Sequence, residues 1–301
     1  MKRVLITGAN GFLGKNLVIH FLNKNYKILG ISRNSNNLKN VLNKIEFIQA
    51  KENQYDSISS DIIRFQPDIV IHAGWDGGNN YKDTNTLDQF KSNIPTGISL
   101  LNIIKQLNKP PTFVGVGSFA EYGMLTTKAR ESQIERPLNF YGLSKYTFKE
   151  ISRLFCQYNN IHWKWVRPCY IYGPGDIHTR VIPSTINNLI KKNPIKLDKC
   201  NVTLDYLYID DFCNAVQAIV ENNTNGVYNI CSGKEYRLKD ILIFLNKQID
   251  KNNKISYNDI SRKLAPQYVC GSNTKLKKTT AWKPKIDLKT GLIKTIQSTH
   301  E

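Results

Sequence analysis

A strand, a glycine-rich turn and a helix open the chain, and no other stretch restricts the fold as strongly. Residues 4–6 form a short apolar run, residues 7–14 read TGANGFLG, and an amphipathic run extends from Lys15 to Asn23. In such a turn the first glycine permits the sharp bend, the second lets a pyrophosphate approach the backbone, and the third lets the helix pack closely. The N–H groups that begin the helix then face the phosphates. The residues predicted to hold a dinucleotide here are Gly8, Asn10, Gly11, Phe12, Leu13 and Gly14.

The length and composition suit one large α/β domain with a smaller lobe. The chain has 301 residues, of which 41% are hydrophobic, so a full core is available. Its apolar runs stay well short of the roughly 20 residues that a membrane helix needs. No secretory segment precedes the first strand. We therefore expect a cytoplasmic enzyme that does not bind a membrane.

The six cysteines and the high positive charge are compatible with an ordinary enzyme. The cysteines form no C-x-x-C pair, which predicts reduced, mostly buried thiols and neither a metal site nor a disulfide framework. The formal net charge of +18 comes from lysines that are scattered along the whole chain. This distribution indicates solvated faces and no nucleic-acid site, and a basic field also attracts phosphorylated cofactors and substrates.

The end of the second predicted strand, over 26–32, bears on the choice of cofactor. Dinucleotide folds place an acidic residue about 20 positions after the glycines, where it binds the ribose 2′-hydroxyl. This chain has Ser32 and Arg33 there, and no carboxylate that would repel a 2′-phosphate. We therefore expect NADP(H), with NAD as the alternative if Arg33 merely stacks on the adenine.

Apolar periodicity predicts further strands over 45–49, 67–74, 112–117 and 161–172, and a helix over 90–107. The predicted apolar face of that helix consists of Ile94, Ile98, Leu101 and Ile104. Ligands bind at the carboxyl ends of parallel strands, so Ala73, Gly74 and Ser118 should line one crevice with the glycine turn. Trp75 follows directly, and it either covers the sugar or nicotinamide or anchors its loop.

The stretch from Tyr141 to Lys145, YGLSK, has a Y-x-x-x-K spacing that suits acid–base chemistry. Residues four apart share one face of a helix, so Lys145 should lie one turn from Tyr141. A tyrosine titrates near 10, and a neighbouring ammonium and the positive nicotinamide lower its pKa. Tyr141 can then exchange a proton with a sugar oxygen while hydride moves between the carbon and the nicotinamide. Lys145 can also hold the nicotinamide ribose, and Ser118 can hydrogen-bond the same sugar oxygen.

These motifs together resemble the extended short-chain dehydrogenase/reductases, a family of nucleotide-sugar epimerases, dehydratases and reductases. The matching segments follow the family order along nearly the whole chain: TGANGFLG at 7–14, YGLSK at 141–145, RPCYIYGPG at 167–175, LDYLYIDD at 204–211, YNICSG at 228–233 and AWKP at 281–284. The resemblance implies a Rossmann-type, doubly wound, mostly parallel sheet and a nucleotide-diphosphate sugar as substrate. It also implies that Ser118, Tyr141 and Lys145 are catalytic and that Asn93 lies near the cofactor.

The reaction type is inferred from departures from the family pattern. The 4,6-dehydratases have Asp-Glu directly after the catalytic Ser or Thr, where this chain has Phe119 and Ala120, and Glu121 should point elsewhere. An adenine contact, Asp-Leu in the family, is replaced at 51–52 by Lys-Glu. The 4-epimerases usually hold NAD with the acidic residue that is absent here. We therefore predict NADPH-dependent reduction of a 4-keto-6-deoxy nucleotide sugar. The alternatives are an NAD-dependent 4-epimerase and a redox-sensing regulator that binds NADP without turnover.

We place the dinucleotide-binding domain at 1–172, with return segments near 206–231, and the smaller substrate-binding lobe mainly at 173–301. Candidates for the substrate diphosphate are Arg180, Arg237 and Arg262, since guanidinium matches phosphate geometry, although each can equally be an ordinary surface arginine. The helix containing Tyr141 should end near Tyr158, and its apolar residues suit either a homodimer or burial within one chain. His72 is expected to be a hydrogen-bonded strand-end residue and not a base.

Overall fold

Seven parallel strands form one central sheet in the order β11-β6-β5-β4-β1-β2-β3. The computed structural model describes residues 1–77, 86–198, 200–250, 255–258 and 267–299. The strands of the sheet are β1 Arg3–Thr7, β2 Lys27–Ser32, β3 Glu46–Gln49, β4 Ile69–His72, β5 Thr112–Val116, β6 His162–Pro168 and β11 Gly226–Ile230. The chain order reverses between β1 and β4, which is where ligands bind in doubly wound sheets. The predicted Rossmann-type sheet is confirmed.

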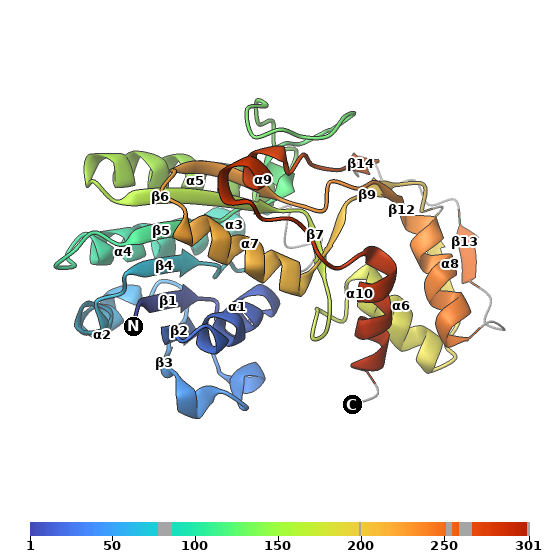
Figure 1. Ribbon diagram of the computed structural model, residues 1–301, viewed down its shortest axis with the longest axis horizontal. Coiled ribbons are helices and arrows are strands. Elements are labelled where there is room, and N and C mark those ends of the chain that lie inside the picture. Colours follow the sequence, from blue (N-terminus) through green and yellow to red (C-terminus); the bar gives the residue numbers. More distant parts are fainter. Residues whose placement is uncertain (78–85, 199, 251–254, 259–266, 300–301) are drawn as a thin grey trace.

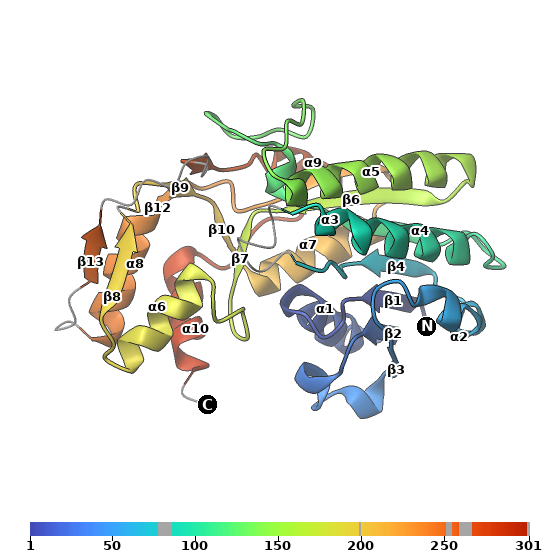
Figure 2. The same ribbon diagram turned by 180° about the vertical axis from the view of Figure 1, so that it is seen from behind.

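Helices cover both faces of this sheet (Figures 1 and 2). One face is packed by α1 Phe12–Asn23 and α7 Ile209–Glu221, and the other by α2 Ser59–Phe65, α4 Asn93–Ile104 and α5 Phe140–Tyr158. Alternate residues of β1 enter the two cores, with Val4 and Ile6 on one side and Leu5 on the other. All three are fully buried, because a parallel sheet with two covered faces needs continuous apolar strands.

A smaller lobe lies beside the sheet, at the right of Figure 1. Its helices are α6 Val181–Ile190, α8 Leu238–Ile249 and α10 Leu288–Gln297. Its strands are β9 Thr203–Leu204, β12 Tyr236–Arg237 and β14 Tyr268–Val269 in one small sheet, and β8 Ile195–Asp198 with β13 Ile255–Asn258 in another. Two short strands, β7 Tyr170–Tyr172 and β10 Tyr206–Tyr208, pair with each other between the lobe and the main sheet.

Two helix predictions need correction. The first helix begins at Phe12, one turn before Lys15, because Gly11 takes the extended conformation of an N-cap. The single helix expected over 90–107 is two helices, α3 Asp88–Lys91 and α4. Pro95 lies in the first turn of α4, where its missing N–H costs nothing, whereas it would interrupt one continuous helix. Ile98, expected on the apolar face, is 40% exposed.

The strand predicted over 161–172 is likewise two strands in two different sheets, β6 and β7. Pro168 ends β6, and a proline has no N–H to continue a sheet ladder. The N–H of Cys169 then bonds to Ile230 O of β11, while Tyr170 pairs with Tyr206 of β10. This switch turns the chain from the sheet toward the lobe.

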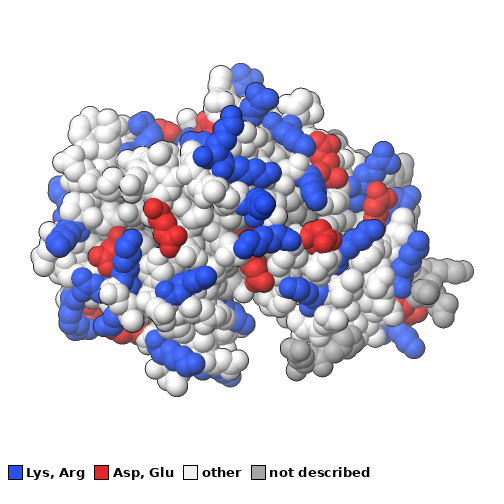
Figure 3. All heavy atoms as spheres, in the orientation of Figure 1, with Lys and Arg blue, Asp and Glu red and all other residues white. Residues whose placement is uncertain are grey.

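The surface charge and the cysteines match the expected pattern. Lysine and arginine side chains spread over both the sheet and the lobe on the face in Figure 3, with Asp and Glu among them. All six cysteines are free thiols, and all but Cys169 are buried.

Within the described residues we find no group of three or more metal-binding side chains. No helix in this part of the chain is both long enough and apolar enough to cross a membrane.

Candidate active site

The glycine turn is packed tightly against the end of β4. Gly8 has φ +66°, and a Cβ there would lie 2.6 Å from the Cα of Gly74. A Cβ at Gly14 would lie 2.1 Å from the carbonyl oxygen of Gly8. Among the described residues, a Cβ at Gly11 would meet only that same oxygen, at 3.2 Å, and the N-cap residue Gly11 makes no side-chain bond to the first turn of α1. Free helix N–H groups beside an uncovered backbone are what a phosphate needs.

Thr7 and His72 join the ends of β1 and β4, a link that sequence reasoning missed. The Thr7 hydroxyl accepts the N–H of Gly74 at 3.0 Å and pairs with His72 Nδ1 at 2.8 Å. His72 is therefore bonded as expected at Nδ1, but its buried Nε2 has no hydrogen-bond partner among the described residues. Burial, and then the charge of Lys145, lower the pKa of His72 to about 3. A base with so low a pKa is neutral in the folded protein.

The end of β2 differs electrostatically from the prediction. Arg33 Nη1 lies 3.2 Å from Asp76, and Arg33 Nε lies 3.7 Å from Glu52. The sequence has no carboxylate directly after β2, but the structure brings these two to Arg33 from the segments that follow β4 and β3. Asn10, predicted to contact the cofactor, accepts the N–H of Asn37 at 2.7 Å with its side-chain oxygen. It ties the glycine turn to the segment after β2.

Asn93 and Trp75 shape the loop that follows β4. The Asn93 amide accepts the N–H of Asp76 at 2.7 Å and donates to Asp76 O at 3.1 Å and to Gln89 O at 3.0 Å. Asn93 thus holds the loop in place. Trp75 donates to Gln89 Oε1 at 3.1 Å, and its ring lies 3.8 Å from Lys145 Nζ. Trp75 therefore anchors its loop and also covers the lysine.

Ser118, Tyr141 and Lys145 come together at the end of β5. Ser118 follows the strand, and the other two lie one turn apart on α5, as the spacing predicted. Lys145 Nζ donates to Val116 O at 2.6 Å and lies 6.0 Å from the Tyr141 ring. Gly142 permits this approach, because a Cβ there would lie 2.4 Å from the carbonyl oxygen of Ala120. Only a glycine lets α5 come so close.

The pKa of Tyr141 is raised in the structure and not lowered as expected. Burial raises it, a hydrogen bond with Ser118 and the charge of Arg180 lower it, and the charge of Glu121 raises it further. Burial lowers the pKa of Lys145 to about 7, against the opposing effect of Glu121. At neutral pH the phenol therefore holds its proton, and the lysine is partly protonated. This pair can give a proton to a substrate oxygen.

The three predicted substrate arginines are in different situations. Arg180 stands before α6, pairs with Asp176 at 3.1 Å and lies 6.0 Å from the Phe12 ring, so it faces both the glycine turn and Tyr141. Arg237 is exposed at the end of β12, in the small sheet of the lobe. Arg262 lies outside the described residues.

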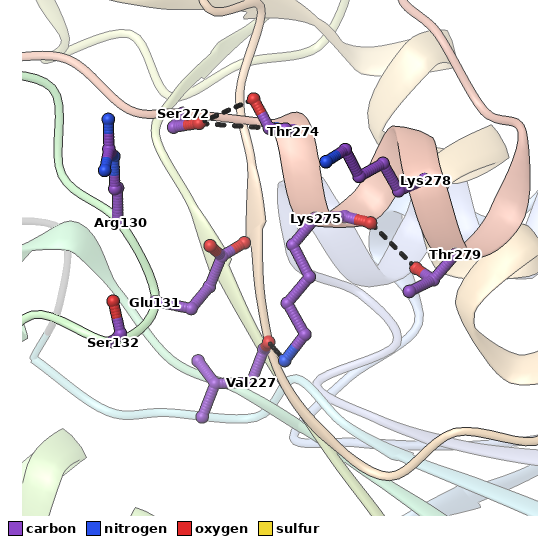
Figure 4. A pocket seen from close by; sticks show the side chains of 9 residues that line it. All are labelled: Arg130, Glu131, Ser132, Val227, Ser272, Thr274, Lys275, Lys278 and Thr279. Carbon is purple, nitrogen blue, oxygen red and sulfur yellow. Dashed lines mark hydrogen bonds between the residues drawn. The ribbon is translucent and has the colours of Figure 1, made fainter.

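A pocket of about 680 Å³ lies at the free edge of the sheet, between β11 and α9 Thr274–Thr280 (Figure 4). Its lining residues are Arg130, Glu131, Ser132, Val227, Ser272, Thr274, Lys275, Lys278 and Thr279. Lys275 donates to Val227 O at 2.7 Å, and Glu131 accepts the N–H of Asn229 at 2.9 Å. These side chains terminate the hydrogen-bonding edge of β11. The pocket shares no lining residue with the predicted site.

Comparisons with known proteins place the chain in one family. Residues 4–231 match the NAD dependent epimerase/dehydratase family. The chain is 25% identical to a CDP-abequose synthase of Yersinia pseudotuberculosis, over 83% of this chain and 86% of that protein. It is 26% identical to a GDP-6-deoxy-D-mannose reductase of Pseudomonas aeruginosa, over 97% of this chain and 95% of that protein.

Solved structures share the fold. A UDP-glucose 4-epimerase of Thermotoga maritima with UDP-glucose superposes with a TM-score of 0.92, at 20% identity, over 99% of this chain and 98% of that one. A UDP-glucose 4-epimerase of Thermus thermophilus in complex with NAD superposes with a TM-score of 0.89, at 20% identity, over 99% of each chain. The chain therefore belongs to the NAD dependent epimerase/dehydratase family and is an NAD(P)-dependent short-chain dehydrogenase/reductase that acts on a nucleotide sugar.

Proposed function

We propose that this enzyme reduces the 4-keto group of a 4-keto-6-deoxy nucleotide sugar with NADPH. The observation that carries the proposal is the meeting of Ser118, Tyr141 and Lys145 at the end of β5, without an acid–base pair for dehydration. Phe119 and Ala120 offer no titratable group, and the Glu121 carboxylate is bonded to Arg167 at 2.8 Å. Relatives named CDP-abequose synthase, GDP-6-deoxy-D-mannose reductase and GDP-L-colitose synthase support a reductase that makes a deoxysugar.

The residues present fit a dinucleotide, since the backbone at Gly11 is uncovered and the first turn of α1 is uncapped. The bound nicotinamide would supply the hydride to the sugar carbon. Tyr141, protonated at neutral pH, gives its proton to the sugar oxygen, which Ser118 holds by a second hydrogen bond. The positive charge of Lys145 stabilises the phenolate that remains. One hydride and one proton together convert the ketone into a hydroxyl.

Arg33 supports NADPH as the cofactor, because a guanidinium at the end of β2 can bind a 2′-phosphate. For that it must exchange its partners Asp76 and Glu52 for the phosphate. The same two carboxylates favour a second candidate function, an NAD-dependent 4-epimerase, in which one of them would accept the ribose hydroxyls. Relatives and neighbours named as UDP-glucose 4-epimerases support this alternative.

The substrate would lie between the sheet and the lobe formed mainly by residues 173–301, with the diphosphate at Arg180.

We further propose a homodimer formed through α4 and α5. Both helices lie on the same face of the sheet, and Ile98, Leu143 and Leu154 are exposed apolar side chains on them. Apolar residues exposed together on a helix pair favour a second helix pair as their cover.

The test combines cofactor titration with turnover. NADPH and NADH are titrated by fluorescence, and nicotinamide absorbance is followed with a panel of 4-keto-6-deoxy nucleotide sugars. We expect preference for NADPH and stoichiometric oxidation with one sugar. Tyr141→Phe should bind cofactor normally and lower kcat by about 10²–10⁴-fold. NAD that remains bound through purification, with no net oxidation, would contradict the reductase and favour the epimerase.

A further inference from the structure

The Glu121 carboxylate is buried directly behind the proposed catalytic residues. It lies in the 3₁₀ turn Phe119–Glu121 that follows β5, and it has no exposed surface. One oxygen accepts the backbone N–H of Ser118 at 2.7 Å, and the other accepts Arg167 Nε at 2.8 Å. The Trp165 indole N–H lies 3.1 and 3.2 Å from the two oxygens. Three donors, two from β6 and one from the segment that follows β5, therefore fix this carboxylate in one position.

Arg167 is itself held from several sides. Its guanidinium lies 4.4 Å from the Tyr122 ring, and its second donor nitrogen bonds to Glu135. Glu135 also accepts Lys149 Nζ at 2.5 Å. Lys149 follows Lys145 by one turn on α5, so the same network reaches the helix that carries Tyr141. A charged network with this many partners holds its members more rigidly than a single surface pair does.

The conformation of Ser118 depends on this carboxylate. Ser118 is the N-cap of the 3₁₀ turn: its hydroxyl accepts the N–H of Ala120 at 3.1 Å, while Glu121 receives its backbone N–H. The two bonds form a capping box, which fixes the backbone and side chain of the cap residue together. The single hydroxyl hydrogen of Ser118 then remains available for Tyr141 in the free protein and for the sugar oxygen when substrate is bound.

We propose that Glu121 is a positioning residue for the reaction: its contact with the backbone of Ser118 sets the direction of the hydroxyl that meets Tyr141, and Arg167 keeps Glu121 in place. This inference rests on the proposed roles of Ser118 and Tyr141. Glu121 itself need not touch the substrate, since its oxygens are occupied by protein donors.

The charge of Glu121 gives this role a signature that a purely structural role lacks. The charged groups that face Tyr141 are Glu121, Arg180 and Lys145. Burial raises the pKa of Tyr141 most, the hydrogen bond with Ser118 and the charge of Arg180 lower it, and the charge of Glu121 raises it. Glu121→Gln keeps the shape of the side chain and removes the charge. Tyr141 should then lose its proton at a lower pH.

The first experiment is a double-mutant cycle of Glu121→Gln with Ser118→Ala. In each of the four proteins kcat is measured for the 4-keto sugar. We expect Glu121→Gln to lower kcat by about tenfold or more in the native background, because a small misplacement of a reacting group is costly. In the Ser118→Ala background it should change kcat by less than about twofold. Equal losses in both backgrounds would overturn the proposal. If Glu121→Gln does not fold, Glu121→Asp keeps the charge for Arg167 and completes the same cycle.

The second experiment needs no substrate, so its outcome is independent of the proposed reaction. The ionisation of Tyr141 is isolated as the difference in ultraviolet absorbance between each protein and its Tyr141→Phe counterpart. We expect the transition to move to lower pH in Glu121→Gln. Asp211→Asn is the matched control, because Asp211 is also buried and accepts backbone N–H groups, those of Lys285 and Ile286, away from Tyr141.

The two experiments separate the possible failures. A shifted Tyr141 transition without any ketosugar turnover would contradict the proposed reaction while supporting the placement of Glu121 against Tyr141. An unshifted transition in folded Glu121→Gln, or an equal shift in Asp211→Asn, would overturn the proposed role of Glu121.

Discussion

Arg33 and Arg167 each pair with two carboxylates near the carboxyl ends of the parallel strands, but Arg33 does so in water and Arg167 in the core. Arg33 is 56% exposed and contacts Asp76 and Glu52 at 3.2 and 3.7 Å. Arg167 and its partner Glu121 have no exposed surface. The chemistry of the two clusters is the same, and the surrounding dielectric differs.

This difference separates an adjustable end of the site from a fixed one. Exposed ion pairs contribute little because water screens them, so Arg33 can exchange its carboxylates for a phosphate at small cost. A buried charge that loses its partner is strongly destabilising, so Arg167 and Glu121 stay together. Cofactor choice is therefore located at the exposed cluster, and the geometry around Ser118 and Tyr141 at the buried one.

The largest expected effect is on stability. Arg167→Met leaves the Glu121 charge buried without its main partner, and we expect the free energy of unfolding to fall by about 3–5 kcal/mol. Arg33→Met should lower it by less than about 1 kcal/mol, because that pair is exposed. Urea unfolding of both variants measures the difference. Equal losses would show that burial does not distinguish the two clusters.

A second effect on stability, which depends on pH, is expected at His72, where the difference in pKa corresponds to about 2 kcal/mol at pH 5. Burial and then Lys145 lower the pKa of this histidine to about 3, while the unfolded chain titrates near 6.5. Between these values the unfolded state binds the extra proton, so the free energy of unfolding should decrease as the pH falls through this window. His72→Asn should flatten the profile in urea unfolding. Replacement of the exposed His162 by Asn is the control for the loss of a histidine side chain.

The smallest effect concerns cofactor affinity at the exposed cluster. Asp76→Asn removes a carboxylate 3.2 Å from Arg33, so the dissociation constant for NADPH should decrease about three- to fivefold. The constant for NADH should change by less than about twofold, and added salt should reduce the gain. Asp61→Asn, which breaks the exposed pair with Arg64 on α2, is the control. Weaker NADH binding with unchanged NADPH binding would instead favour Asp76 as a ribose ligand and the epimerase.

Much of the scaffold was predictable because it depends on hydrophobic periodicity and residue spacing within single strands, turns and helices. The turn at 7–14 needs its glycines within one strand–turn–helix unit, and Tyr141 and Lys145 share a helix face through their spacing alone. The helix predicted over 90–107 and the strand predicted over 161–172 failed because each element is interrupted. Pro95 and Pro168 each lack an N–H, so the chain starts a new helix at one place and leaves the sheet at the other.

The sequence by itself therefore determined the glycine turn and the shared helix face of Tyr141 and Lys145, since each rests on residues within a few positions of one another. The order of the motifs along the chain indicated the parallel sheet. Only the tertiary structure decided which charges meet. Asp76 reaches Arg33 because β4 and β2 both flank β1, and Arg167 reaches Glu121 because β6 lies beside β5. The physical reason is that strand order and burial, which no local pattern encodes, set both the distance between two charges and the dielectric around them.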